Sequence, residues 1–388
     1  LAEKNRNEPQ IIKSFFFRSK YLMVLNENAG QLIFESLAQE RKVATLPTKA
    51  ILESVYATML TDVYNAKRYT YDTRTATTEP AGEDFSTWTV FNFKTEIDMA
   101  WKRSLAHREE LYKVPLTQYR EIIDFGESSS TFERSLYDFL AGRYLDAGRY
   151  KLNITNPEKI FGVTLQAEAL DIAGGDDKSA LKEKLLFCRD LEEFYLPKKD
   201  ALHYQNSVLR RLRFAYNSLS NNYSANAPYL ATLNTLSGEW KDSYFAGHAR
   251  FASAEIYYRM ADKLKAPENR KIALAIADEF LMKGKTDLYT SAFNLRKTIL
   301  EKKATLTSEV YNPPGKPSLA LLEHTNVDSV LVRIYKTNRS FFSNRQKKRD
   351  YYSLATPKPF TEKWYYLNRK SDDYFEDRKS TRLNSSHT

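Results

Sequence analysis

The chain of 388 residues contains one cysteine, Cys188. A single thiol cannot form an intramolecular disulfide, and it cannot supply a multi-cysteine metal site. Cys188 lies in the segment LLFCRDL, whose apolar residues have helical spacing, and we expect a buried structural thiol. Long apolar runs are lacking too, because no stretch approaches the length that a membrane-spanning helix needs.

Histidine is scarce, with 5 residues in the whole chain. The histidines that precede residue 377 have no second histidine or cysteine at the spacing of metal ligands, and we expect them to face solvent or cap helices; they are His107, His203, His248 and His324. Nucleotide-binding glycine patterns and the HExxH and GxSxG motifs of hydrolases are absent as well. The sequence therefore predicts no catalytic, cofactor-binding or metal-binding residue, no cofactor, and a protein that is not an enzyme.

Two segments invite a ligand-binding interpretation. Gly174-Gly175 precedes Asp176-Asp177, which we interpret as a turn followed by a helix N-cap rather than as a metal or phosphate loop. The basic segment 345–349 stands beside Tyr351 and Tyr352, a combination that occurs in nucleic-acid-binding proteins. The net charge of +10, however, is spread in clusters of mixed sign, as is typical of solvated helices. We therefore interpret 345–349 as a solvated loop and expect no nucleic-acid partner.

Apolar and aromatic residues are abundant, at 42% and 13%, so the chain can form a large core, and its length predicts two or more domains. Apolar residues recur at helical spacing up to residue 304, as with Val208, Leu212 and Tyr216. Helices are expected over 1–26, 31–44, 46–64, 97–105, 135–146, 181–195, 201–219, 229–240, 244–264, 270–282 and 291–303. Short helices with tight turns are typical of tetratricopeptide-like hairpins. The expected fold is mainly α, as an irregular helical-hairpin solenoid or a single irregular bundle.

The pattern changes after residue 304. The segment 312–315, Asn-Pro-Pro-Gly, suits neither a helix nor a central strand. Val330, Val332 and Ile334 then alternate with the residues between them, as in a half-buried strand, and strands are expected at 318–322, 327–335 and 364–367. So few strands do not close a β-sandwich. We assign 1–304 to a helical repeat or bundle region and 305–376 to a truncated, partial β-sandwich domain.

The C-terminal segment 377–387 has the sequence DRKSTRLNSSH. It resembles the in-frame translation of a common sequencing-library adapter. We therefore expect residues 377–388 to be an adapter artefact rather than native sequence, and the fold prediction excludes them.

Several segments, in order, carry a resemblance to a known family. They are PTKAILESVYATML at 47–60 with DFSTW at 84–88, RSLYDFLAGRYLD at 134–146, and KPSLALLEHTNVDSVLVRIYK at 316–336 with WYYLNRKSDDYF at 364–375. Together they resemble the N-terminal part of large bacterial alpha-2-macroglobulin family proteins. These proteins carry a long helical region ahead of macroglobulin-type β-sandwich domains. The resemblance covers nearly the whole chain up to Glu376.

The resemblance implies an exported protein of the periplasm or cell envelope, in a family whose members are often anchored to the membrane by a lipid. The family is regarded as a set of protease traps, in which cleavage of a bait segment makes the β-domains collapse around the protease. Some members then bond covalently through a thioester in a C-G-E-Q motif. That motif is absent here and Cys188 lacks such a neighbourhood, so no functional residue is transferred. Proteases would be bound by parts of the parent protein outside these residues.

Two hypotheses follow. In the first, the chain is the non-catalytic N-terminal scaffold of a cell-envelope alpha-2-macroglobulin-like protease inhibitor. In the second, it is a helical-repeat module that binds an envelope protein or a peptide without any protease trapping. Exposure of the parent protein to a protease distinguishes them, because only trapping predicts an early cut followed by compaction.

Overall fold

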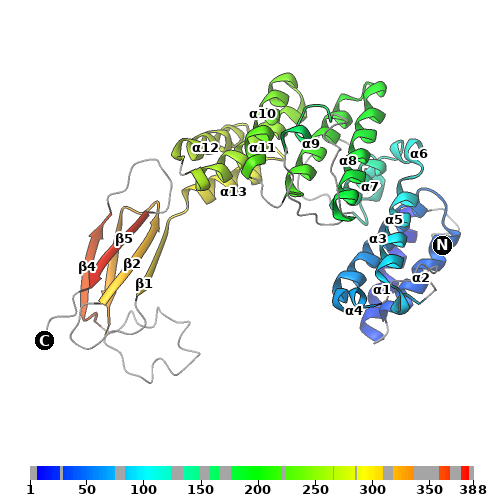
Figure 1. Cartoon of the computed structure of the whole chain (residues 1–388), viewed down its shortest axis with the longest axis horizontal. Helices are drawn as coiled ribbons and strands as arrows, with labels where there is room; N and C mark the ends of the chain where they lie inside the picture. Colours follow the sequence, from blue (N-terminus) through cyan, green and yellow to red (C-terminus); the bar gives the residue numbers. More distant parts are fainter. Residues whose placement is uncertain are drawn as a thin grey trace. The chain divides into compact units, whose positions relative to one another are not determined.

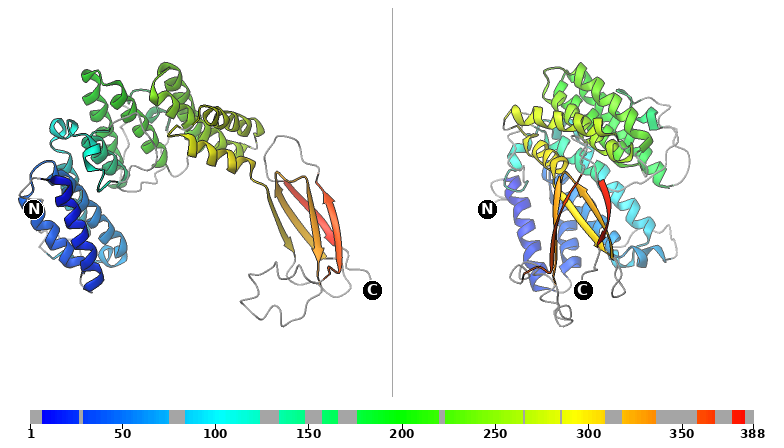
Figure 2. Two further views of the ribbon diagram at one scale, coloured as in Figure 1. Left: turned by 180° about the vertical axis from the view of Figure 1, so that it is seen from behind. Right: turned by 90° about the vertical axis from the view of Figure 1, so that its left-hand side faces the viewer.

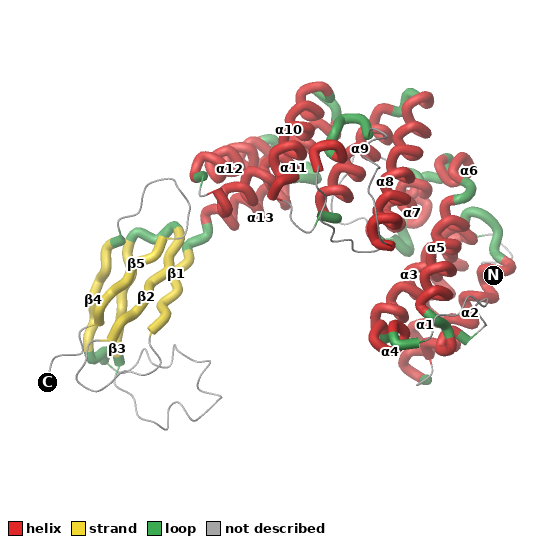
Figure 3. Tube along the Cα trace, in the orientation of Figure 1, coloured by secondary structure: helices red, strands yellow, loops and turns green. Residues whose placement is uncertain are grey.

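The computed structural model describes residues 7–26, 29–74, 84–123, 134–147, 157–165, 176–219, 223–264, 266–284, 286–308, 318–335, 358–367 and 377–383. Within these ranges the chain is mainly helical, with a few short strands (Figure 3). Its contacts divide the chain into two compact units, Leu1–Ala249 and Arg250–Thr388. Each unit is described by itself.

The first unit is built from consecutive α-helices with short 3-10 turns between some of them (Figure 1). The α-helices are α1 (Glu8–Leu25), α2 (Ala29–Val43), α3 (Thr48–Ala66), α4 (Arg68–Asp72), α5 (Val90–Leu105), α6 (Arg108–Tyr112), α7 (Leu136–Asp146), α8 (Asp176–Tyr195), α9 (Ala201–Asn217) and α10 (Tyr223–Glu239). The 3-10 turns are η1 (Phe85–Thr87), η2 (Leu116–Tyr119), η3 (Pro157–Ile160) and η5 (Leu196–Lys198). Helix α11 (Tyr244–Leu264) contains the boundary between the units.

Two apolar clusters of described residues belong to the core of the first unit. The first lies between α1, α2, α3 and α5 and includes Phe34, Leu52, Leu60, Phe93 and Trp101. The second joins α1 and α3 to α6, η2, α7 and α8; its members include Ile12, Ile51, Leu111, Leu116, Leu136, Leu140, Leu191 and Tyr195. Each such large apolar side chain stabilises the fold by about 1.5–3 kcal/mol when it is fully buried. Helix α3 contributes to both clusters and is therefore buried on most of its sides.

Among the helices whose first residues and caps are described, α5 and α7 begin at capping boxes. Thr89 caps α5, because its hydroxyl accepts from the backbone N–H of Asn92 while the Asn92 side chain accepts from the Thr89 backbone. Ser135 caps α7 in the same way with Asp138. Such reciprocal bonds satisfy backbone donors that the first turn of a helix leaves free. The capping box thereby fixes the Asp138 carboxylate, which also belongs to a buried polar cluster around His203.

The second unit combines helices with strands. Phe251 and Ala254 on α11 pack with α12 (Pro267–Met282) and α13 (Tyr289–Leu300), where Ile276, Phe280 and Ala292 are buried. The strands are β1 (Lys303–Ser308), β2 (Ser318–Thr325), β3 (Ser329–Ile334), β4 (Thr361–Tyr366) and β5 (Asp377–Leu383). Figure 2 shows strands of this unit as arrows. Their pairing gives two antiparallel sheets, ordered β1-β2-β5 and β3-β4.

The turn between β2 and β3 is bonded to the end of α13. Asn326 has a φ of 56°, a left-handed conformation that asparagine tolerates better than most residues. Its side-chain amide donates to the carbonyl oxygens of Ile299, at 2.8 Å, and Glu301, at 3.0 Å. These carbonyls belong to the last turn of the helix, where no intrahelical partner is available. The helix-to-strand junction is therefore held by side-chain bonds as well as by the chain itself.

The mainly helical fold expected from the sequence is confirmed, but some predicted boundaries are wrong. Helix α10 begins at Tyr223 rather than at Tyr229, and Pro228 lies inside it. Proline normally ends or kinks a helix because it lacks an N–H. Here the helix is held on both sides of Pro228, because Tyr216 donates to the Asn226 side chain at 2.8 Å and Tyr229 packs on Tyr216 with 4.9 Å between ring centres. Tertiary contacts outweigh the local preference.

The strands also differ from the sequence prediction. The helix expected to reach residue 303 ends at Leu300, and Lys303–Ser308 is the strand β1. All residues of β1 are exposed, so no alternation of apolar residues marks this strand in the sequence. Strand β5 consists of residues that we expect to be adapter-encoded. Its pairing with β2 needs only backbone groups and is compatible with that expectation. The domain boundary at 304/305 stays a prediction, and segments 312–315 and 345–349 lie outside the described residues.

Candidate functional site

The most elaborate polar cluster surrounds His203 on α9. Its imidazole lies between two carboxylates, with Nε2 2.9 Å from Asp138 and Nδ1 2.8 Å from Asp200. Tyr195 donates to the other oxygen of Asp138 at 2.7 Å, and the Tyr112 hydroxyl donates to Asp200. The imidazole is 12% exposed and the Asp138 side chain 2%. The cluster therefore connects α6, α7, the end of α8, and α9, and Asp200, at 23% exposed, is its more accessible carboxylate.

The charges of this cluster stabilise one another. Burial alone lowers the pKa of His203, but the hydrogen bonds and charges of Asp138 and Asp200 outweigh burial and raise the pKa of this imidazole. Burial raises the pKa of Asp138, yet bonds from His203, Ser135 and Tyr195 outweigh it and lower that pKa. The two imidazole nitrogens point at different carboxylates, so the three groups do not converge on one metal position. The arrangement suits a buried ion triad that joins helices.

A second cluster surrounds Glu53 on α3, whose side chain is 3% exposed. Arg41 from α2 and Arg103 from α5 contact the same carboxylate oxygen, at 2.7 and 3.0 Å. The Arg41 guanidinium also lies 3.5 Å from the ring centre of Tyr56, and Arg103 contacts Glu96 at 2.6 Å. Charge pairs and cation–π contacts of this kind link three helices through one buried carboxylate.

A third cluster centres on Arg211 of α9, whose side chain is completely buried. Its Nε donates to Glu192 on α8 at 2.6 Å. The remaining nitrogens donate to the carbonyl oxygens of Ile160 at 3.2 Å, Gly162 at 3.1 Å and Val163 at 2.7 Å. The planar guanidinium thus fixes the irregular segment after η3 against two helices, a task that suits its rigid set of donors.

Lys184 on α8 serves the end of α7. Its ammonium donates to the carbonyl oxygens of Tyr144, Leu145 and Ala147, which belong to the last turn of that helix or follow it. A cation near a helix C-terminus is favoured by the helix dipole and satisfies free carbonyls. Burial lowers the pKa of Lys184 to about 8. Because the ammonium already donates to backbone carbonyl oxygens, we assign Lys184 a structural role, which is to hold the end of α7 against α8.

The structure corrects the expectation that the histidines face solvent or cap helices. His107 agrees with it, because its side chain is 53% exposed beside Glu110. His203 is buried between carboxylates, and His324 on β2 is 3% exposed, so the expectation is wrong for both. Ala320, Leu322 and His324 stand at every second position of β2, and all three are buried. This spacing of two is the signal in the sequence that could have predicted the burial of His324. His248 is half-buried against the rings of Tyr244 and Phe245.

Cys188 behaves as the sequence predicts, as a buried structural thiol. It is 1% exposed within α8. Burial, and secondarily the charge of Glu192, raises the pKa of its thiol to about 12. Only the thiolate is nucleophilic, so this side chain is unreactive in the folded protein. Gly174 and Gly175 lie outside the described residues, whereas Asp176 is the first residue of α8, consistent with a turn that leads into a helix.

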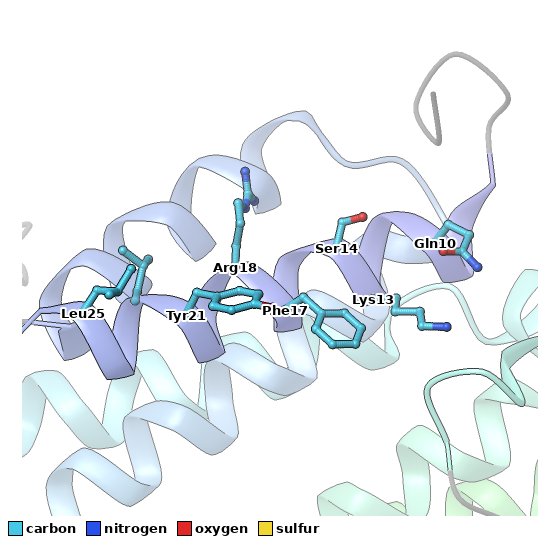
Figure 4. Close-up of a pocket in the computed structure, with 8 residues that line it drawn as sticks. Gln10, Lys13, Ser14, Phe17, Arg18, Tyr21 and Leu25 are labelled. Atoms are coloured by element: carbon cyan, nitrogen blue, oxygen red, sulfur yellow. The ribbon is translucent and has the colours of Figure 1, made fainter.

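The outer face of α1 differs from these buried clusters because it presents apolar side chains to solvent. Phe17 is 52% exposed, Tyr21 65% and Leu25 81%, and they line a shallow groove of about 560 Å³ (Figure 4). Isolated exposed apolar residues are common, but a contiguous set on one helix marks a candidate interaction surface. We call this set, with Val24, the α1 apolar face.

Within the described ranges, no group of three or more His, Cys, Asp or Glu residues is placed to hold a metal ion. Among the helices of these same residues, none has the length and apolar content to cross a bilayer. No protein-family model, no curated protein and no solved structure matches the chain. The polar clusters and the α1 apolar face are therefore the basis for a functional proposal.

Proposed function

We propose that the chain is the non-catalytic N-terminal scaffold of a cell-envelope alpha-2-macroglobulin-like protein that inhibits proteases by trapping. In this proposal the helical-hairpin region of 1–304 leads into the first, partial macroglobulin-type β-sandwich of 305–376. The parent protein is exported to the periplasm and anchored by a lipid. The bait segment and any thioester belong to parts of the parent outside these residues.

The observation that carries the non-catalytic assignment is the use made of the buried charged groups. In the described part of the chain, His203, Glu53, Arg211 and Lys184 all contact groups from other helices or their ends. Catalytic acids, bases and nucleophiles must instead reach a substrate from an accessible position. Charged groups placed in this way rigidify a helical array. The order of helices before antiparallel strands and the sequence resemblance support the family assignment.

The test is to mix the full parent protein with a broad-specificity protease. Trapping predicts one early cut, a decrease in hydrodynamic radius, and a protease that still hydrolyses small peptide substrates but no longer large ones. A protease with a chemically blocked active site is the control, and it should produce neither the cut nor the compaction. Progressive degradation at many sites without compaction would count against trapping.

The alternative function, an envelope interaction module without trapping, is favoured by one specific observation, the α1 apolar face. A surface of this kind is expected where a partner binds. The two functions separate in the protease experiment, because an interaction module has no reason to compact when it is cut.

A further inference from the structure

The α1 apolar face lies opposite the side that anchors α1 in the core. Ile12 and Phe15 are 0% and 3% exposed, whereas Phe17 is 52% exposed only two residues beyond Phe15. Successive residues advance by about 100° around an α-helix, so Phe17, Tyr21 and Leu25 follow one another along a single exposed ridge. Figure 4 shows these three side chains along the outer side of α1. The helix is thus apolar on both its buried and its exposed sides.

Cationic side chains border this ridge. Helical geometry places Lys13 and Lys20 along one edge and Arg18 along the other. Lys13 contacts Glu121 at 3.1 Å and Arg18 contacts Glu40 at 2.5 Å, and the four side chains are between 22% and 57% exposed. Exposed pairs of this kind are worth only ~0–1 kcal/mol and exchange readily with a partner's charges. The face therefore combines an apolar centre with positive borders.

We infer that the α1 apolar face binds an amphipathic helix of a partner protein, one whose apolar residues recur at i, i+4 and i+7 and whose flanks carry Asp or Glu. The ridge from Lys13 to Leu25 is about 18 Å long at 1.5 Å per residue, the length of roughly three helical turns. Ridges formed by residues four apart are the surfaces that pack into the grooves of another helix. Acidic flanks on the bound helix match the cations on both borders.

Two other occupants fit less well. A second copy of this chain would present the same borders, in which Lys13 and Arg18 are already paired with Glu121 and Glu40, so it would not offer the acidic flanks that match these cations. A uniformly anionic lipid surface would meet Glu40 and Glu121, which stand among those cations. A helix can instead place its carboxylates opposite individual cations and avoid the acids. The discrete charge pattern favours a protein partner.

The test is selection of peptides from a display library of random helical segments against the full chain. Enriched peptides should have the apolar spacing and acidic flanks described above. The variant F17S/Y21S should weaken their binding by at least about tenfold, because anchors at the centre of an interface dominate affinity. The variant Y69S/F293S is the matched control, since Tyr69 is 91% and Phe293 50% exposed on other helices. Circular dichroism checks that all variants remain folded.

Salt and charge reversal test the cationic borders separately. The substitution K13E/R18E should weaken the selected acidic peptides, and added salt should weaken binding to the wild-type chain. Binding to vesicles of phosphatidylglycerol tests whether a lipid surface covers the α1 apolar face, and sedimentation of the free chain tests whether a second copy does. The inference is overturned if enriched peptides lack acidic residues or bind F17S/Y21S as well as wild type. It is also overturned if F17S/Y21S instead abolishes vesicle binding or dimerisation. Because no protease is involved, failure of trapping leaves this result unchanged.

Discussion

Replacement of His203 by glutamine tests whether the buried ion triad holds the helices together. Glutamine can donate to one carboxylate but carries no charge, so Asp138 and Asp200 lose their shared cation. Loss of one member of a buried ion pair costs about 3–5 kcal/mol. Ser135 and Tyr195 still donate to Asp138, so we expect the lower end, about 3 kcal/mol. With a urea dependence of ~2 kcal/mol per molar, the unfolding midpoint should fall by about 1.5 M.

The pH dependence of this effect follows from the directions of the pKa shifts. The pKa of His203 is raised from 6.5, so its contribution is fully present below pH 6.5 and is lost as pH rises through the folded-state pKa. The pKa values of Asp138 and Asp200 are lowered from 3.8, so their contribution is present above pH 3.8 and is lost as pH falls through the folded-state values. The triad is therefore most stabilising between pH 3.8 and 6.5.

The assay is urea unfolding followed by far-ultraviolet circular dichroism at about pH 6 and about pH 9. The difference in stability between wild type and H203Q should be large at the lower pH, and it should decrease as the pH rises through the folded-state pKa of His203, which lies above 6.5. H107Q is the control, because His107 is exposed and its loss should change stability by under ~0.5 kcal/mol. Equal effects of H203Q and H107Q on stability would refute the reasoning. So would a difference in stability between wild type and H203Q that does not decrease as the pH rises.

Two further predictions concern α8 and α9. R211M leaves Glu192 buried without its cation and should lower the free energy of unfolding by about 3–5 kcal/mol in urea unfolding. R213M, at an exposed position of the same helix, should change this free energy by less than ~0.5 kcal/mol. Similar effects of both substitutions would contradict the structural role of Arg211. Cys188 should react with a thiol reagent at pH 8 on the order of 1000-fold more slowly in the folded chain than in urea, because its pKa rises from 9.0 to about 12; comparable rates would show an accessible thiol.

The sequence predicts most helices because their apolar residues pack on one side. Val208, Leu212 and Tyr216 are buried as their spacing indicates, and Cys188 is buried as expected. Strand β1 could not be predicted, since it pairs through its backbone and exposes every side chain. The start of α10 was missed because the helix is held on both sides of Pro228 by contacts with Tyr216 on the preceding helix α9, which the local pattern around Pro228 does not show.

The polar clusters were also beyond prediction from sequence. Asp138 and His203 are 65 positions apart, and nothing local indicates that they meet. The α1 apolar face was hidden for a different reason. Phe15 and Phe17 stand in one aromatic run, and only the packing of α1 decides which of them is buried. Spacing alone cannot separate a buried side from an exposed one when both are apolar.

The bonds from Asn326 to the end of α13 also have a mechanical consequence. Only Glu301 and Lys302 separate the last residue of α13 from β1, so these two residues are the pivot for any bending between the helix and the strand. Because the Asn326 amide holds the carbonyls of Ile299 and Glu301, bending at this pivot must break two hydrogen bonds. The Asn326 side chain therefore opposes bending at this junction, and N326A would remove both hydrogen bonds.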